Sequence, residues 1–168
     1  MKKKSRIIIT SLLFSICILF AAAGDVWSEE YVSLKGLKSV KAVFDFRIGD
    51  PQSTALHLKL IHQTFNDKNI TAITNKPDFV VLIIGESVKL VSKNRERFSP
   101  EQQKILGEIA DVISAMSKDG IKFEICMFAA NAMAVAPSSI LPEIKQVGNG
   151  WISLIGYQAG GYSLVPAY

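Results

Sequence analysis

The chain has 168 residues, of which 49% are hydrophobic and 20% are charged. This length supports one domain with a hydrophobic core and is short for two, and the composition excludes a disordered chain. The net charge of +4 has a local source, because Lys2, Lys3, Lys4 and Arg6 precede every acidic residue. Without these four, 15 basic residues stand against 15 acidic ones, so the charge gives no support for nucleic-acid binding.

Residues 1–24 have the pattern of a secretory signal peptide. A basic start precedes the apolar run IIITSLLFSICILFAAAG, which closes on small residues. We therefore expect cleavage between Ala23 and Ser28 and export of the mature protein to the periplasm, without stable membrane contact afterwards. The alternative is a retained N-terminal membrane anchor, for which this run is at the short end.

The elements expected after the signal alternate between strands and helices. Residues 25–38 form a polar lead-in, and a short β-rich run follows from Lys41 to Ile48. Asp50 is placed to cap a helix that has Pro51 at its first position. The almost wholly apolar segment from Asp78 to Gly85 predicts a strand buried on both faces, as in a parallel sheet.

The second half of the chain continues this alternation. A capping box and an N1 proline at SPEQ, Ser99 to Gln102, predict a long helix that Gly120 ends. IKFEIC, EIKQV and YSLVP are expected strands, with a helix over Trp151 to Gln158. MFAANAMAV is compatible with a helix until Pro137. We predict one α/β domain over residues 39–168, with a mainly parallel sheet covered by helices on both faces.

Cys126 stands where an apolar strand ends and a helix begins. The signal carries away Cys17, so the mature chain has one cysteine and no internal disulfide. At the carboxyl end of a parallel strand, the backbone N–H groups of residues 128–130 would face the sulfur and favour a thiolate. A thiolate can hold sulfane sulfur as a persulfide without a cofactor or metal. The other interpretation stays open, in which Cys126 is an inert core residue among apolar neighbours.

Four segments resemble the DsrE/DsrF-like family: KAVFDFRIGDP, FVVLIIGESVKLV, GIKFEICMFAANAM and the ending ILPEIKQVGNGWISLIGYQAGGYSLVPAY. The resemblance runs from about Lys41 to Tyr168. It implies a Rossmann-like, three-layer α/β fold with a mostly five-stranded sheet, and assembly into homo-oligomers, trimers or related forms. Well-understood members carry sulfur as a cysteine persulfide, a role that the match in FEIC assigns to Cys126. The following MFAANAM departs from the polar sequence common in the family.

Other polar residues are candidates for supporting or competing roles. Asp45, Asp50 and Asn131 are expected near the same end of the sheet as the cysteine, where they would supply polar contacts. The two histidines, His57 and His62, lie about 140° apart around a helix axis and do not converge on one ion. We therefore expect no metal site.

A small basic cluster, Lys93, Arg95 and Arg97, has two interpretations. It is either a solvated loop or a rim that steers anionic sulfur compounds such as thiosulfate. The function expected is sulfur transfer through a Cys126 persulfide, with donor and acceptor proteins or small sulfur compounds as partners. The alternative is a non-catalytic, oligomeric binding or scaffold module in which the cysteine is inert.

Aromatic residues crowd the C-terminal quarter. Trp151, Tyr157, Tyr162 and Tyr168 lie there together with several aliphatic residues. Such a set packs either a core or a subunit interface, and we expect an interface for part of it.

Overall fold

The structure, a computed structural model, describes residues 31–168. The expected signal peptide, its cleavage region and Cys17 lie outside the described residues. A compact unit extends over Gly36–Tyr168. A one-turn 3-10 helix, Val32–Leu34, precedes it in the sequence. No helix within residues 31–168 has both the length and the apolar character needed to cross a membrane.

Five parallel strands form one sheet in the order β4-β3-β2-β1-β5. This confirms the α/β fold with a five-stranded parallel sheet. The apolar segment that predicted a doubly covered strand is β2, which lies at the centre of the sheet. The strands are β1 (Lys41–Phe46), β2 (Asp78–Ile83), β3 (Lys122–Cys126), β4 (Ile144–Val147) and β5 (Ser163–Ala167).

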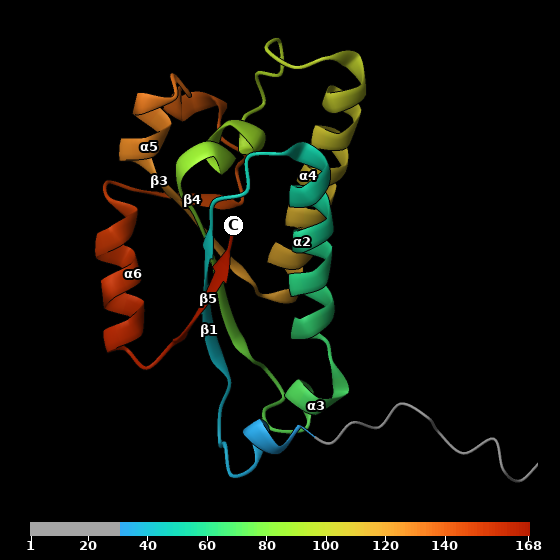
Figure 1. Cartoon of the computed structure of the whole chain (residues 1–168), viewed down its shortest axis with the longest axis vertical. Helices are drawn as coiled ribbons and strands as arrows, with labels where there is room; N and C mark the ends of the chain where they lie inside the picture. The colour runs from blue at the N-terminus through green and yellow to red at the C-terminus, as the bar shows by residue number, and fades with distance from the viewer. Residues whose placement is uncertain (1–30) are drawn as a thin grey trace, which may run out of the picture. The chain divides into compact units, whose positions relative to one another are not determined.

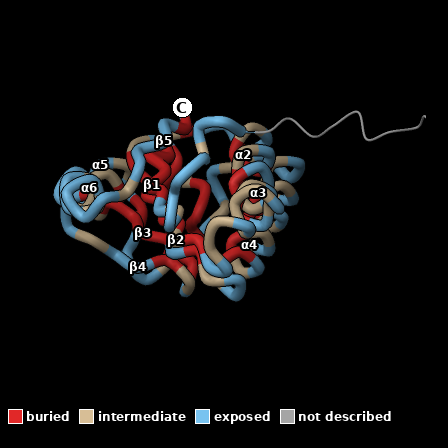
Figure 2. Tube along the Cα trace, turned by 90° about the horizontal axis from the view of Figure 1, so that it is seen from below, coloured by how far each residue is buried: buried red, intermediate tan, exposed pale blue. Residues whose placement is uncertain are grey.

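Helices cover both faces of the sheet (Figures 1 and 2). The helices α2 and α4 pack against each other on one face, and α6 crosses the other face in contact with β1, β2 and β3. The helices are α2 (Pro51–Phe65), α3 (Lys68–Thr71), α4 (Pro100–Asp119), α5 (Met127–Ala132) and α6 (Gly150–Ala159), with 3-10 helices η2 (Gly85–Val91) and η3 (Pro137–Ser139).

The hydrophobic core is divided between the two faces because side chains alternate along each strand. The larger cluster lies between the sheet and the pair α2 and α4, where Phe44, Phe79 and Ile109 are buried. A smaller cluster lies under α6 and consists of Val43, Val80, Leu82, Ile84 and Cys126. The cysteine therefore points to the face that α6 covers.

The expected helix starts and stops are present. Asp50 caps α2 by accepting a hydrogen bond from the Ser53 N–H at 2.7 Å. Ser99 and Gln102 form the capping box of α4. That helix ends at Gly120, which has a φ of 105° and takes the left-handed conformation that favours glycine. These signals are local, so the sequence alone predicts them.

The helix expected after Cys126 is shorter than its sequence allows. It ends at Ala132, and Ala134 adopts a left-handed conformation with a φ of 53°. This turn lets Val135, whose N–H donates to the Ala130 carbonyl, enter the core. Arg97 donates hydrogen bonds to the carbonyls of Met133 and Ala134. Burial of Val135 and this arginine contact outweigh the helix propensity of the segment.

Candidate functional site around Cys126

Cys126 is the last residue of β3 and the N-cap of α5, as the sequence predicts. It pairs with Val147 of β4. On its other side, the register of β1, β2 and β3 places Ile84 and then Arg47 in the same row, one residue beyond the ends of their strands. Three chain segments thus bring a thiol, an aliphatic side chain and a guanidinium to one end of the sheet.

The helix that follows Cys126 contributes less to the thiol than the sequence indicates. The N–H of Phe128, expected to face the sulfur, donates instead to the Gly148 carbonyl at 3.0 Å. The Cys126 side chain makes no capping hydrogen bond, and α5 has only six residues. A short helix presents few aligned peptide dipoles, so α5 supplies little positive charge at this thiol.

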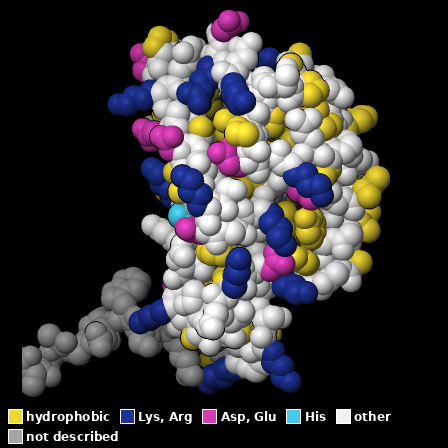
Figure 3. Space-filling view, turned by 180° about the vertical axis from the view of Figure 1, so that it is seen from behind, with side chains coloured by type: hydrophobic (Ala, Val, Ile, Leu, Met, Phe, Trp, Pro, Cys, Tyr) yellow, Lys and Arg dark blue, Asp and Glu magenta, His cyan; other side chains and the backbone are white. Residues whose placement is uncertain are grey.

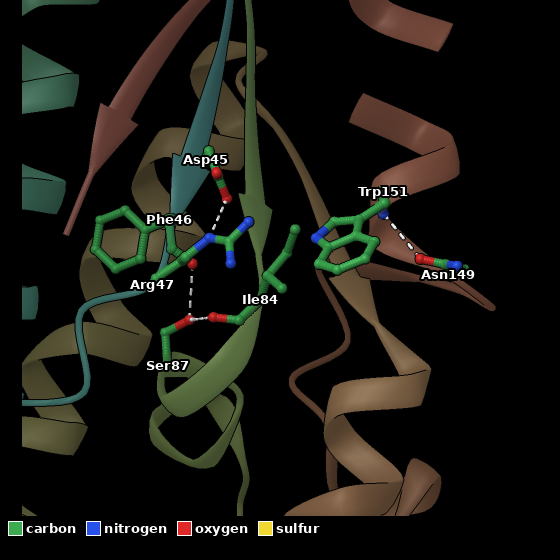
Figure 4. Close-up of polar contacts among 7 residues, drawn as sticks. All are labelled: Asp45, Phe46, Arg47, Ile84, Ser87, Asn149 and Trp151. Atoms are coloured by element: carbon green, nitrogen blue, oxygen red, sulfur yellow. Dashed lines mark hydrogen bonds and ion pairs between the residues drawn. The ribbon is translucent and has the colours of Figure 1, made fainter. Parts of the chain in front are cut away.

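The start of α6 closes over Cys126 at van der Waals distance. A Cβ atom added at Gly150 would lie 2.9 Å from the Cys126 Cβ and 3.0 Å from the Ile84 Cδ1. The helix begins at this point because Asn149 caps it: its Oδ1 accepts a hydrogen bond from the Trp151 N–H at 3.0 Å (Figure 4). This close approach leaves Cys126 only 4% exposed.

Cys126 nevertheless lines a cavity of about 350 Å³. Within the described residues, Arg47 is the only charged side chain in its lining. Phe128 and Trp151 are 75% and 60% exposed, so they stand at the mouth of the cavity. The lining consists of Arg47, Ile84, Gly85, Cys126, Phe128, Ala129, Ala132, Met133, Asn149 and Trp151.

Arg47 is fixed by a buried carboxylate. Its Nε donates to the Asp45 Oδ1 at 2.9 Å, and the guanidinium points toward Ile84 (Figure 4). The hydrogen bond to Asp45 raises the pKa of Arg47 against the opposing effect of burial, and the negative charge of Asp45 raises it further. The guanidinium therefore supplies the cavity with a permanent positive charge close to the thiol.

A second buried carboxylate lies on the same strand and the same face as Cys126. Glu124 accepts a hydrogen bond from the Tyr157 hydroxyl at 3.0 Å, and Lys145 lies 3.6 Å from the same oxygen. Its other oxygen has no hydrogen-bond partner within residues 31–168. Burial and the bond to Glu124 raise the pKa of Tyr157. Glu124, Tyr157 and Lys145 line a separate cleft, which lies toward the start of β3 and away from the thiol.

Of the three polar residues expected near Cys126, one belongs to the site and two lie outside it. Asp45 is buried and belongs to the site through its ion pair with Arg47. Asp50 is exposed and caps α2, where a hydrogen bond from the Ser53 backbone lowers its pKa. Asn131 is exposed on α5 and does not line the cavity.

The basic cluster after η2 also lies apart from the cavity lining. Arg97 binds the carbonyls of Met133 and Ala134, and Arg95 donates to the Gln103 carbonyl. Lys93 is exposed, and its backbone N–H donates to the Ser139 carbonyl at 2.7 Å. Two of the three residues therefore hold loops in place.

The two histidines have separate partners. The Nδ1 of His57 lies 2.8 Å from the Ser53 carbonyl oxygen, and the Nε2 of His62 lies 2.6 Å from the Asp119 carboxylate. Within residues 31–168, no group of three or more His, Cys, Asp or Glu side chains is arranged to hold a metal ion.

Sequence reasoning missed Arg47 as a site residue. A signal was available, because Asp45 and Arg47 are two residues apart on a strand and so share one face. Trp151 was expected in a core or an interface, and the structure places it at the mouth of the cavity. Its proximity to Cys126 depends on how α6 returns over the sheet, which no local pattern indicates.

Comparisons with known proteins agree with this fold. Residues 41–166 match the DsrE/DsrF-like family. An uncharacterized protein of Aquifex aeolicus is 26% identical over 128 residues, which are 76% of this chain and 56% of that protein. The chain thus spans little more than half the length of this curated relative.

Two solved structures share the fold. One is a protein of unknown function from Methanobacterium thermoautotrophicum, with a TM-score of 0.57 and 15% identity over 76% of this chain and 99% of that one. The other is the YchN protein of E. coli, with a TM-score of 0.55 and 10% identity over 77% of this chain and 99% of that one. With the family match over most of the domain, these findings show that the chain belongs to the DsrE/DsrF-like family.

Proposed function

We propose that this protein is an exported sulfur carrier that holds sulfane sulfur as a persulfide on Cys126. Membership of the DsrE/DsrF-like family supports a role of the sulfur-relay type. The observation that carries the proposal is that Cys126 and Arg47 line one cavity. A thiolate is the nucleophile in sulfur exchange, and a nearby cation favours the thiolate.

The transfer needs neither a metal nor an external oxidant. The Cys126 thiolate attacks the outer sulfur of a donor, the donor's sulfur–sulfur bond breaks, and its electron pair leaves with the rest of the donor. An acceptor thiolate later attacks the outer sulfur of the persulfide and releases the Cys126 thiolate. The Cys126 thiolate and the persulfide are both anions. The Arg47 guanidinium lines the same cavity, so it would stabilise both of them.

Export and self-association are further parts of the proposal. The basic start and apolar run of residues 1–24 support export to the periplasm. Self-association is supported by exposed apolar side chains on α5 and α6, which Figure 3 shows gathered along one edge of the molecule with few charges among them. Partners would be a second copy of the chain and donors or acceptors of sulfur, either proteins or small compounds.

A second candidate function has an observation in its favour. Cys126 is 4% exposed and packs against Gly150 and Ile84. Such packing is typical of an inert cysteine. In this case the exposed surface of α6 would carry the function, as an oligomeric binding or scaffold module.

Intact-mass analysis separates these two functions. After incubation with a sulfane-sulfur donor, we expect the purified protein to gain about 32 Da, the mass of one sulfur atom, and to lose it on reduction. Because Cys126 is the proposed carrier, Cys126→Ser is expected to abolish this gain. The mass before incubation also reports whether residues 1–24 have been removed.

Where residues 1–24 have been removed, Cys126 is the one cysteine of residues 25–168 and no second thiol can take the sulfur. For protein purified with residues 1–24 still attached, the control is Cys17→Ser. This variant is expected to load sulfur as the unaltered protein does. Absence of any sulfur gain, together with a Cys126 thiol that is alkylated only after unfolding, would establish the inert interpretation.

A further inference from the structure

The lining of the Cys126 cavity restricts the sulfur donors that suit it. Apart from the thiol, most of the lining is aliphatic or aromatic, and one guanidinium supplies its charge. We propose that the donor is a sulfane-sulfur compound with an apolar organic group and a single negative charge on its sulfur-bearing head. This inference rests on the proposed function and names its substrate class.

The charge of the cavity favours a monoanion over a dianion. Arg47 already pairs at 2.9 Å with Asp45, which is buried, so the guanidinium is shared before any donor arrives. An inorganic dianion such as thiosulfate would bring a second negative charge into a region with no second cation among the described lining residues. An unpaired charge removed from water is costly. A monoanion brings one negative charge fewer into this region, so its entry costs less.

The apolar walls favour an organic group next to the transferable sulfur. Phe128 and Trp151 are largely exposed at the mouth, and Ile84, Ala129 and Met133 lie with them in the lining. An apolar group that covers these side chains removes apolar surface from water, whereas a hydrated inorganic anion does not. The volume of about 350 Å³ is at the lower end for small-molecule sites, which suits one ring and a small head group.

An organic thiosulfonate, R–SO₂–S⁻, has both properties and gives a balanced reaction. The Cys126 thiolate attacks the outer sulfur of the thiosulfonate. The sulfur–sulfur bond breaks, and its electron pair leaves with the sulfinate R–SO₂⁻. The products are the Cys126 persulfide anion and the sulfinate. The two negative charges are conserved, no proton is exchanged, and no further oxidant or reductant takes part.

A series of three donors tests the inference, because they share the outer sulfur and differ in the group attached to the sulfonyl. The donors are benzenethiosulfonate, methanethiosulfonate and thiosulfate. The measurement is the rate of sulfur gain by intact mass, divided for each donor by its rate with free cysteine in the same buffer. We expect benzenethiosulfonate to exceed thiosulfate by at least about tenfold, given the apolar area that the ring covers.

Variants locate this preference in the cavity. Phe128→Ser and Trp151→Ser are expected to reduce the preference for benzenethiosulfonate severalfold, because they remove the apolar mouth. Leu56→Ser is the matched control, since Leu56 is an exposed apolar residue on α2, outside the lining. Arg47→Gln is expected to slow sulfur gain from all three donors.

The possible results test the donor class separately from the sulfur-carrier function on which it rests. If Cys126 gains sulfur from thiosulfate as fast as from benzenethiosulfonate after correction, the inference is overturned and the carrier function stands. A preference that is unchanged in both Phe128→Ser and Trp151→Ser also overturns it. If no donor loads Cys126, the carrier function fails, and the inference fails with it.

Discussion

At the scale of single residues, the site depends on one close contact and one ion pair. Gly150 lets α6 approach Cys126 to a distance that no larger residue allows. Asp45 holds Arg47 by its Nε, so the rest of the guanidinium can face the cavity. Both residues act by placing a neighbour: Gly150 places the wall over the sulfur, and Asp45 places the positive charge.

Gly150→Ala is expected to lower the free energy of unfolding by about 1–3 kcal/mol, the usual cost of overpacking a close contact. The new methyl group would lie 2.9 Å from the Cys126 Cβ, which is held by the strand backbone and cannot move aside. Urea denaturation measures the change. Gly156→Ala is the control, since nothing crowds that position of α6, and it is expected to stabilise by about 0.5–1 kcal/mol. Equal effects in the two variants would contradict the proposed contact.

At the scale of elements, the amino end of the sheet is tied by one carboxylate. Asp78, the first residue of β2, accepts hydrogen bonds from Lys122 of β3 at 2.8 Å and from Tyr162, just before β5, at 2.6 Å. Burial acts to raise the pKa of Asp78, but these two bonds outweigh it and leave the pKa below its usual value. The carboxylate therefore links β2 to β3 and to the connection between α6 and β5.

The lowered pKa of Asp78 makes this stabilisation depend on pH. It is present in full above the pKa of the unfolded state, near 4, and is lost as the pH falls through the lower folded-state value. We expect Asp78→Asn to lower the free energy of unfolding by no more than about 1 kcal/mol at pH 7, since the group is partly exposed. The difference should shrink as the pH falls below the unfolded-state value and vanish once the carboxyl group is protonated in the folded state as well.

Urea denaturation from pH 7 to pH 2.5 measures this difference. Asp111→Asn is the control, because Asp111 is exposed on α4 and has no ion pair within residues 31–168. It is expected to leave the stability unchanged over the same range. A difference between Asp78→Asn and the unaltered protein that did not shrink as the pH fell would rule out the charge as its cause.

At the scale of the whole molecule, the domain leaves a group of apolar side chains exposed on α5 and α6. Ile152 and Ile155 are 69% and 68% exposed and lie three residues apart on the same side of α6. Phe128 and Trp151 extend this group to the mouth of the cavity. Such a group is typical of a protein interface, so self-association would take place beside the entrance to the site.

Ile155→Asp is expected to shift the protein from an oligomer to a monomer in sedimentation velocity at micromolar concentration. A buried aliphatic side chain contributes about 1.5–3 kcal/mol to an interface, and a charge in its place adds the cost of desolvation. Leu60→Asp, on the exposed side of α2, is the control and is expected to leave the oligomer intact. A monomeric unaltered protein would disprove self-association, and dissociation by both variants would disprove the role of α6.

The sequence by itself determined the elements and the fold class. The Ser99 capping box, the Gly120 stop and the apolar β2 segment are signals that act over a few residues, and the structure confirms each. The position of Cys126 at a strand end follows from the same kind of signal. Local propensity failed after Ala132, where the left-handed turn at Ala134 and the burial of Val135 end the helix.

Only the tertiary structure decided what surrounds the sulfur. The register of three strands places Arg47 in the same cavity lining as Cys126. Trp151 joins this lining because α6 packs across the same face of the sheet. The N–H of Phe128 binds Gly148 for the same reason, since the β4–α6 connection lies beside α5. Capping and strand burial depend on neighbours along the chain. A cavity depends on how distant segments pack together, and local patterns in one sequence carry no direct record of that packing.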